Sequence, residues 1–283
     1  MPDPIDLHAH SSVSDGTETP AELVQAALTA GLGTVALTDH DSTAGWREAF
    51  DAATGTGLTV IPGMELSTRR GWKSIHLLAY LIDPDDAALR EETLRIREAR
   101  LTRAEAIVSR LAADFDISWS DVVAQTSHGT TVGRPHIADA LVARGIAANR
   151  SAAFADILHP KFGYYEPHYA PDPLLAIQLV RAAGGVPVLA HPGTRGIENV
   201  VAEESLAALV DAGLFGLEIH HRENTPDAMV RLFEYAERFG LAVTGSSDYH
   251  GAGKPNRLGE NTTELEVLDR IRSLGTGAEA FRG

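Results

Sequence analysis

Residues 5–40, IDLHAHSSVSDGTETPAELVQAALTAGLGTVALTDH, hold a complete strand–helix–strand unit. The apolar run at residues 5–7 predicts a buried strand, and residues 34–38 predict a second one. Between them, the TPAE segment at residues 19–22 is a capping box with proline at the first helical position, so we expect a helix that ends at Gly31. A helix between two strands implies that the strands are parallel and that the helix lies outside the sheet.

The alternation of strand and helix signals continues beyond this unit. Further buried strands are expected at residues 58–62, 75–81, 186–190, 214–219 and 241–244. Further helices are expected at residues 173–183 and from Thr225-Pro226 to Gly240. Seven strands favour an α/β barrel over an open sheet, although composition alone does not decide between the two.

One region interrupts the alternation. Residues 86–170 contain helix signals only, at residues 86–115, 120–125, 135–144 and 151–158. We interpret this region as a helical insertion that caps a barrel formed by residues 1–85 and 171–283. It carries ten basic and eleven acidic residues, so it repels an anion far less than the rest of the chain does. An ordinary solvated helical face accounts for this balance equally well.

Composition excludes several classes of chemistry. The 283 residues include no cysteine, which rules out disulfides, cysteine nucleophiles and thiolate metal sites. Neither a signal peptide nor an apolar run of membrane-spanning length is present, so we expect a cytoplasmic protein with no membrane contact. The net charge of −15 argues against a general nucleic-acid-binding surface. An acidic protein that handles an anionic substrate needs local positive charge, and bound metal is a ready source.

Histidine and carboxylate side chains gather at the ends of the predicted strands. They are His8, His10, Asp15, Asp39, His40, Glu65, His76, His191, His220, His221, Asp248 and His250. In parallel α/β folds the carboxyl ends of the strands meet at the face where active sites are built. So many carboxylates and imidazoles at one face need positive charge between them. A nitrogen and oxygen donor set suits Zn²⁺, Mn²⁺ or Fe²⁺, and the number of donors implies two or three ions.

The spacing within two of these segments supports shared ligation. In His8-Ala9-His10 and in Asp248-Tyr249-His250, the outer residues are two apart. Residues two apart in an extended segment point to the same side, so both side chains can reach one ion. One such pair is a weak signal, but two pairs at opposite ends of the chain are a strong one.

These segments, read in order, resemble a known family. His8-Ala9-His10 with Ser14-Asp15-Gly16, the LTDHD segment at residues 37–41, the PGME segment at 62–65, the AHP segment at 190–192 and the SDYH segment at 247–250 are similar to motifs of the PHP (polymerase and histidinol phosphatase) superfamily. The resemblance covers nearly the whole chain. It implies a distorted seven-stranded (β/α)7 barrel with a helical insertion, and a metal-dependent phosphoesterase that uses a trinuclear centre.

The resemblance also implies ligand groups for two to three divalent ions. His8, His10, Glu65 and Asp248 would hold one ion; Asp15, His40 and His250 a second; and Glu65, His76 and His191 a third, with Glu65 bridging. Asp39 is expected to orient His40 or a neighbour rather than to bind metal. A hydroxide bridging two metal ions would be the nucleophile, with His221 and Asp15 as groups for proton transfer or for shaping the site.

The chain is most similar to the stand-alone members of the family that have a helical insertion. These members remove the 3′-phosphate of nucleoside 3′,5′-bisphosphates or trim short RNA from its 5′ end, so a nucleotide or short oligonucleotide is the expected substrate, with no obligate protein partner. Arg134 precedes Pro135 at a predicted helix start, where a phosphate would meet a guanidinium and a helix N-terminus. Arg134 with His136 is therefore the first choice for a substrate phosphate, and His221 with Arg222 is the second.

Three other functions remain open at this point. The first is a histidinol-phosphate phosphatase, and the second is a metal-dependent amidohydrolase, because related barrels use similar centres on C–N bonds. The third is a regulatory or proofreading module that needs a partner, against which the complete ligand set argues. The sequence has neither a Gly-x-Ser-x-Gly elbow nor a P-loop, which argues against an α/β-hydrolase and a P-loop nucleotidase.

Overall fold

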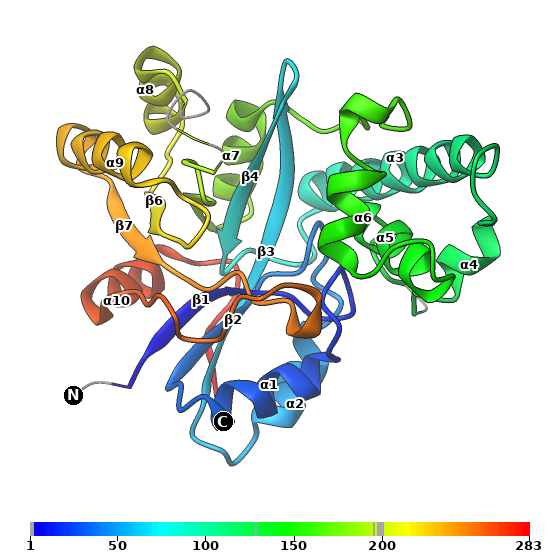
Figure 1. The fold of residues 1–283 in the computed structure, drawn as a ribbon. Helices are drawn as coiled ribbons and strands as arrows, with labels where there is room; N and C mark the ends of the chain where they lie inside the picture. Colours follow the sequence, from blue (N-terminus) through cyan, green and yellow to red (C-terminus); the bar gives the residue numbers. More distant parts are fainter. Residues whose placement is uncertain (1–2, 128, 195, 197–200) are drawn as a thin grey trace.

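The computed structural model describes residues 3–127, 129–194, 196 and 201–283. Its sheet has the order β1 to β7, with a short strand β8 added beside β3 (Figure 1). The strands are β1 (Ile5–Ala9), β2 (Thr34–Leu37), β3 (Thr59–Arg70), β4 (Lys73–Tyr80), β5 (Val186–Leu189), β6 (Gly216–His220), β7 (Ala242–Gly245) and β8 (Phe281–Arg282).

The sheet closes almost completely between β1 and β7. A bridge joins Ala9 to Tyr249, just beyond β7, and the backbone N–H of His10 donates to the Tyr249 carbonyl at 2.8 Å. The prediction of a seven-stranded α/β barrel is therefore confirmed. All seven predicted strands form, and all but β3 lie within a few residues of the expected bounds.

The direction of β4 differs from the expectation of parallel strands. β4 runs antiparallel to both β3 and β5, while the pairs β1–β2, β2–β3, β5–β6 and β6–β7 are parallel. The reason is the connection between β3 and β4, in which Arg70 pairs directly with Lys73 around a two-residue turn. Such a short turn can only join antiparallel strands, and Gly71 takes the positive φ of 59° that it needs.

β3 is also longer than predicted and carries Glu65 within it. The strand spans twelve residues, whereas the apolar run suggested residues 58–62 only. Glu65 and Ser67 alternate with the core residues Met64 and Leu66, and all four are buried. The strand continues because one face packs in the apolar core and the other lines a polar interior, a pattern that a search for apolar runs misses.

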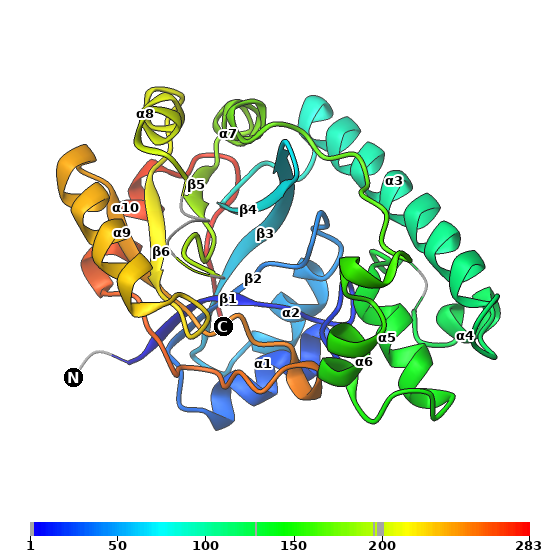
Figure 2. The same cartoon turned by 45° about the horizontal axis from the view of Figure 1, so that its top comes forward.

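Helices surround the barrel (Figure 2). They are α1 (Pro20–Thr29), α2 (Trp46–Ala53), α7 (Pro173–Ala182), α8 (Glu203–Asp211), α9 (Pro226–Phe239) and α10 (Leu265–Leu274). The predicted capping box of α1 is confirmed, since Thr19 accepts from the Glu22 N–H and Glu22 accepts from the Thr19 N–H. α2, α8 and α10 were not predicted.

Within residues 87–162, all the regular elements that the structure describes are helical. They are α3 (Ala87–Leu111), α4 (Trp119–Val123), α5 (Arg134–Ala143), α6 (Arg150–Asp156) and the 3₁₀ turn η1 (Pro160–Phe162). α3 to α6 pack around an apolar core of their own that includes Ile107, Leu111 and Ile137. Figure 2 shows them grouped at one side of the barrel. Among the described helices, none combines the length and the apolar character needed to cross a bilayer.

Candidate metal centre

The first cluster of donors lies inside the barrel, where β1 meets β3 and the segment after β7. The Nε2 atoms of His8 and His10 are 3.0 Å apart. Both lie 3.1–3.3 Å from Oε2 of Glu65 and 3.3–3.4 Å from Oδ1 of Asp248. All four side chains are buried. His8, His10, Glu65 and Asp248 thus form one compact group that could hold a metal ion.

The spacing of these donor atoms fits a bound ion. Nitrogen and oxygen ligands lie about 2.0–2.2 Å from Zn²⁺ and similar ions, so neighbouring ligands of one ion are roughly 3.0–3.5 Å apart. The distances between His8, His10, Glu65 and Asp248 fall in that range. The donor types and their spacing therefore suit a divalent transition metal.

Glu65 faces donors on two sides. Its Oε2 atom looks toward His8, His10 and, at 3.2 Å, Nδ1 of His40. Its Oε1 atom lies 2.6 Å from Nδ1 of His76 and 3.1 Å from Nε2 of His191. One carboxylate between two sets of imidazoles has the geometry needed to bridge two ions.

A further group forms around Asp15 in the loop after β1. Oδ1 of Asp15 is 3.2 Å from Nε2 of His250 and 3.6 Å from Nδ1 of His10. Oδ2 of Asp15 is 3.7 Å from Nε2 of His40, so His40 lies between Asp15 and Glu65. Nε2 of His250 and Nδ1 of His40 are buried without a hydrogen-bond partner in the described part of the chain. Buried nitrogens in that state are available as metal ligands.

One acidic residue of the centre was not predicted. Glu218 lies in the middle of β6, fully buried, and Oε1 of Glu218 is 2.9 Å from Nδ1 of His8. Its Oε2 accepts from the backbone N–H of His191 at 2.8 Å. Glu218 therefore holds two of the candidate ligands in place, and it can itself join a group with His8 and His191. A charged residue inside an otherwise apolar strand was the signal for it.

The pKa values show how strongly the centre demands positive charge. Burial lowers the pKa of His8, but Glu218, Glu65 and Asp248 outweigh this effect and hold it well above the usual value. In the same way, Asp248 and Glu65 overcome burial and raise the pKa of His10 to about 9. The pKa of Glu218 falls to about 2, because His8 and other imidazoles outweigh its burial. Protons or metal ions must supply the compensating charge.

Asp39 holds the loop that carries the ligands rather than a ring of the centre. Its Oδ1 accepts from the Ser11 N–H at 2.8 Å and from the Ser14 hydroxyl at 2.6 Å. Its Oδ2 accepts from the Ser11 hydroxyl at 2.6 Å. Ser14 in turn lies 3.3 Å from Nδ1 of His10. Asp39 thus stands behind His10 and Asp15.

Two candidate ligands sit on strained backbone. His191 has a φ of 30° and Asp248 a φ of 54°. Residues other than glycine rarely adopt positive φ, and such strain is concentrated at functional sites. These conformations turn both side chains toward the centre, where Nε2 of His191 meets Glu65 and Oδ1 of Asp248 meets the two histidines of β1.

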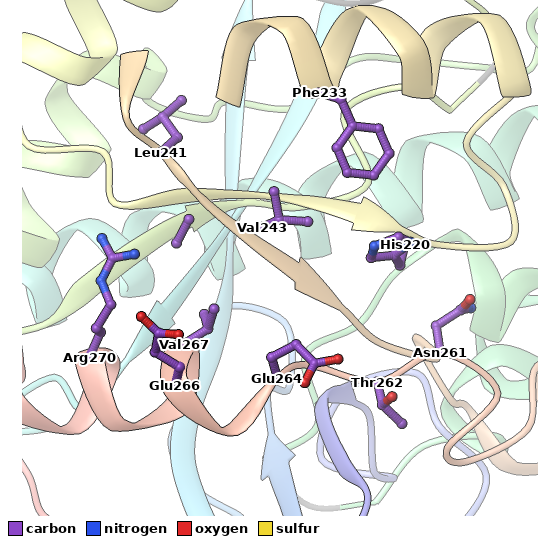
Figure 3. A pocket seen from close by; sticks show the side chains of 11 residues that line it. His220, Phe233, Leu241, Val243, Asn261, Thr262, Glu264, Glu266, Val267 and Arg270 are labelled. Atoms are coloured by element: carbon purple, nitrogen blue, oxygen red, sulfur yellow. The ribbon is translucent and has the colours of Figure 1, made fainter. Parts of the chain in front are cut away.

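His220, the last residue of β6, and His221, which follows it, point in opposite directions. His221 is buried, with Nε2 at 3.6 Å from Oδ2 of Asp248, so it lies beside the centre. His220 instead lines a groove of about 620 Å³ on the outside of the barrel, with Phe233 and Arg270 (Figure 3). The strand alternation separates the two neighbours, so His220 is not part of the centre.

A lysine that was not predicted from the sequence also reaches the centre. Nζ of Lys254 is 2.6 Å from Oδ2 of Asp248. Burial lowers the pKa of Lys254, but Asp248, Glu223 and Asp15 outweigh that effect and raise it. Lys254 thus holds the outer oxygen of Asp248, while the inner oxygen faces His8 and His10.

Beside the centre, arginines from three elements come together. Arg100 and Arg103 project from α3, Arg69 from β3 and Arg134 from the start of α5. The charges of Arg69, Arg100 and Arg134 all lower the pKa of Arg103. Arg100 is neutralised, since it donates to Asp41 at 2.9 Å and to the Ser67 hydroxyl at 2.6 Å. We call Arg69, Arg103 and Arg134 the arginine cluster.

Two members of the arginine cluster have no carboxylate partner among the described residues. Arg103 is 7% exposed, and the Nε atoms of Arg69 and Arg103 are buried without a hydrogen bond in the part of the chain described. Burial, followed by the neighbouring arginines, lowers the pKa of Arg103 to about 9. A buried cation without a partner is costly, so this cluster has the properties of an anion-binding site.

The four residues predicted to bind phosphate lie in four different places, of which His221 is beside Asp248. Arg134 is in the arginine cluster, with its guanidinium 5.1 Å from the ring centre of Tyr165. His136 is buried, accepts from the Gly133 N–H at 3.1 Å and lies nearer to Asp15. Arg222 is held by Glu260 at 2.7 Å. Only Arg134 therefore faces the site that the buried arginines define.

The sequence did contain a signal for Arg100 and Arg103. The buried face of α3 includes Ile96, Arg100, Arg103, Ile107 and Leu111. These residues recur at intervals of three and four, which is the spacing of one helix face. Two arginines on an apolar stripe are unusual, because arginine is rarely buried without a partner.

Comparisons with known proteins agree with this geometry. The family model of the PHP domain matches residues 6–115. The chain is 32% identical to a 3′,5′-nucleoside bisphosphate phosphatase of Chromobacterium violaceum over 273 residues, which cover 94% of each protein. It is 32% identical over 249 residues to the 5′-3′ exoribonuclease Rnm of Salmonella typhimurium, covering 87% of this chain and 84% of that one. A candidate metal-dependent phosphoesterase from Bifidobacterium adolescentis has a crystal structure that superimposes with a TM-score of 0.93, at 45% identity and 96% coverage of each chain.

Proposed function

Because this chain belongs to the PHP family of metal-dependent phosphoesterases, we propose that it removes a terminal phosphate from a nucleotide. The favoured substrate is a nucleoside 3′,5′-bisphosphate, whose 3′-phosphate is transferred to water while the 3′-oxygen of the nucleoside leaves. The names of two relatives support a nucleotide or short RNA substrate. The observation that carries the choice of a bisphosphate is the arginine cluster beside the metal centre.

The donor groups support two to three divalent ions, of which Mn²⁺, Fe²⁺ and Zn²⁺ suit the ligand types. His8, His10, Glu65 and Asp248 would hold one ion, and Asp15, His40 and His250 a second. Glu65, His76 and His191 would hold a third, with Glu65 bridging. Divalent ions supply a water nucleophile of lowered pKa and positive charge for the phosphoryl oxygens.

A second phosphate on the substrate explains the arginine cluster. The metal centre accounts for the phosphate that is cleaved, and it uses none of Arg69, Arg103 and Arg134. A second phosphate would supply the negative charge that the described surroundings of Arg69 and Arg103 lack. It would also discriminate strongly, since Arg103 stays buried without a carboxylate among the described residues when that phosphate is missing.

The proposal is tested by phosphate release from a small panel of substrates. Adenosine 3′,5′-bisphosphate, adenosine 5′-monophosphate and histidinol phosphate are each supplied to enzyme that has been treated with a chelator and reloaded with Mn²⁺. We expect the highest kcat/KM for the bisphosphate. A preference for histidinol phosphate, which has one phosphate and a cationic remainder, would refute the bisphosphate choice and leave the phosphoesterase activity standing.

A further inference from the structure

The β3–β4 hairpin extends beyond the metal centre and ends in an exposed tryptophan. Trp72 forms the turn with Gly71 and is 87% exposed. The other large hydrophobic side chains that are exposed in the described chain reach at most 60%. The same two strands carry Glu65 and His76 of the metal centre, and Figure 1 shows the hairpin rising away from the sheet.

Strand alternation indicates which residues of the hairpin share the face of the metal centre. His76 pairs with Ser67 and Ser74 pairs with Arg69, so these residues share the face that carries Glu65. The 3.4 Å distance between Oγ of Ser74 and Nε2 of His76 agrees with this. Trp72 lies in the turn between Gly71 and Lys73, so it stands at the outer end of this face of the hairpin.

Contacts on both sides of the hairpin fix its orientation relative to the barrel. On the opposite face, Arg70 makes two hydrogen bonds to Asp172, at 2.9 and 3.1 Å, just before α7. On the inner side, Arg69 donates from its backbone N–H to the Pro171 carbonyl at 2.8 Å and from its side chain to the Tyr165 hydroxyl at 3.4 Å. The direction of the tip is therefore fixed relative to the barrel.

The inner face and the turn beyond it present three kinds of group at increasing distance from the metal centre. Glu65 and His76 lie at the level of the metal centre, and Arg69 with Ser74 lies two residues higher. Trp72 is four residues beyond His76, which is about 13 Å along a strand. A phosphate bound at the metals, a second phosphate near Arg69 and a base at Trp72 would follow one strand of nucleic acid outward from the centre.

We propose that Trp72 is a stacking platform for a base of a single-stranded oligonucleotide whose 3′-terminal phosphate lies at the metal centre. This inference rests on the proposed action on nucleotide phosphates and adds a binding position for a nucleotide beyond the reacting one. Aromatic side chains stack on unpaired bases with little regard to sequence, because every base has a π-face. A mononucleotide would leave Trp72 empty, whereas a short oligonucleotide would reach it.

The test compares a mononucleotide with an oligonucleotide in the Mn²⁺-loaded enzyme. Trp72→Ala should raise KM for a 3′-phosphorylated penta-adenylate by about 5- to 150-fold, the effect of losing one stacked base. Its kcat/KM for adenosine 3′,5′-bisphosphate should not change. Trp72→Phe should restore most of the loss, since a phenyl ring still stacks. Phe233→Ala, which removes a 40% exposed aromatic ring from the outer groove, is the matched control and should affect neither substrate.

Binding is measured separately by tryptophan fluorescence. The chain has three tryptophans, and Trp46 is buried with its Nε1 bonded to the Gly63 carbonyl at 2.8 Å. A penta-adenylate that ends in a 3′-methylenephosphonate, whose C–P bond resists hydrolysis, should quench the emission of the wild type and quench Trp72→Phe much less. Equal quenching in both proteins would overturn the inference, as would equal effects of Trp72→Ala on both substrates. If the bisphosphate is not cleaved but Trp72→Ala still weakens oligonucleotide binding, the proposed function fails and the stacking site stands. If Trp72→Ala changes neither KM for the cleavable penta-adenylate nor the binding of the resistant one, the stacking role of Trp72 is refuted.

Discussion

Replacing Arg103 by methionine should make the substrate-free protein more stable and the enzyme worse. Arg103 is 7% exposed, its Nε has no partner among the described residues, and burial with the neighbouring arginines lowers its pKa to about 9. The group is still charged at pH 7, because about 9 is above 7. The full cost of the charge is therefore present at neutral pH and decreases only as the pH rises above about 9.

The size of the effect follows from this pKa. A pKa near 9 lies roughly three and a half units below that of a free arginine, and each unit corresponds to about 1.36 kcal/mol. The charge thus costs on the order of 5 kcal/mol in the substrate-free protein. Methionine keeps the apolar stem and removes the charge, and replacing buried ionic groups with apolar ones typically gains about 1–4 kcal/mol. For a chain of this length we expect the Tm to rise by about 2–8 °C.

The same variant should lose its preference for a bisphosphate. Removing a charged hydrogen bond to phosphate costs about 1.5–3 kcal/mol, so kcat/KM for adenosine 3′,5′-bisphosphate should fall about 10- to 150-fold. The assay pairs differential scanning calorimetry without substrate with steady-state phosphate release. Arg90→Met is the control on the same helix, because its side chain is 61% exposed. A lower Tm for Arg103→Met, or an unchanged kcat/KM, would refute the anion-site reasoning.

Three further substitutions test the centre and its surroundings in four measurements. Glu65→Gln should reduce the metal content measured by elemental analysis, because its two oxygens face different sets of imidazoles, and an unchanged content would contradict a bridging role. Arg134→Ala should leave the metal content unchanged while kcat/KM for the bisphosphate falls about 10- to 150-fold; unaltered kinetics would assign Arg134 to the surface. Glu218→Gln should weaken metal binding about 10- to 100-fold in a chelator competition, because Glu218 orients His8, and equal affinity would exclude that role. In the metal-free protein, the lowered pKa of Glu218 contributes stability above about pH 4.5 that is lost as the pH falls toward 2, so Glu218→Gln should flatten the fall of Tm in this window, and a parallel fall in both proteins would contradict the assignment.

The sequence predicts the centre well because its residues follow a simple rule. His8, His10, His40, His191 and Asp248 come directly after or at the ends of apolar runs, where the strands of a barrel converge. Their meeting point follows from the topology alone. Glu218 escaped the same reasoning because it lies within a strand, and only the structure shows that its side of β6 faces His8.

The arginine cluster could not be placed from the sequence for a different reason. Arg69 is on β3, Arg103 on α3 and Arg134 on α5, and nothing in the local pattern fixes how α3 docks against the barrel. That docking depends on a tertiary contact in which Arg100 of α3 meets Asp41 and Ser67. Asp41 follows His40 and Ser67 lies two residues after Glu65, so the helix is anchored next to the metal ligands themselves.

This anchoring also explains how a chain of net charge −15 can bind an anion. At an ionic strength near 0.15 M, exposed charges more than about 8 Å apart are largely screened from one another. The acidic exterior therefore contributes little to the electrostatic potential at the site. The nearest fixed charges determine whether an anion binds there. Asp41 neutralises Arg100, and this ion pair anchors α3 to the barrel. Arg103, one turn further along the helix, has no carboxylate partner in the described chain. One arginine of the pair thus positions the other, and the ion pair that secures the helix is what keeps the second cation beside the metal centre.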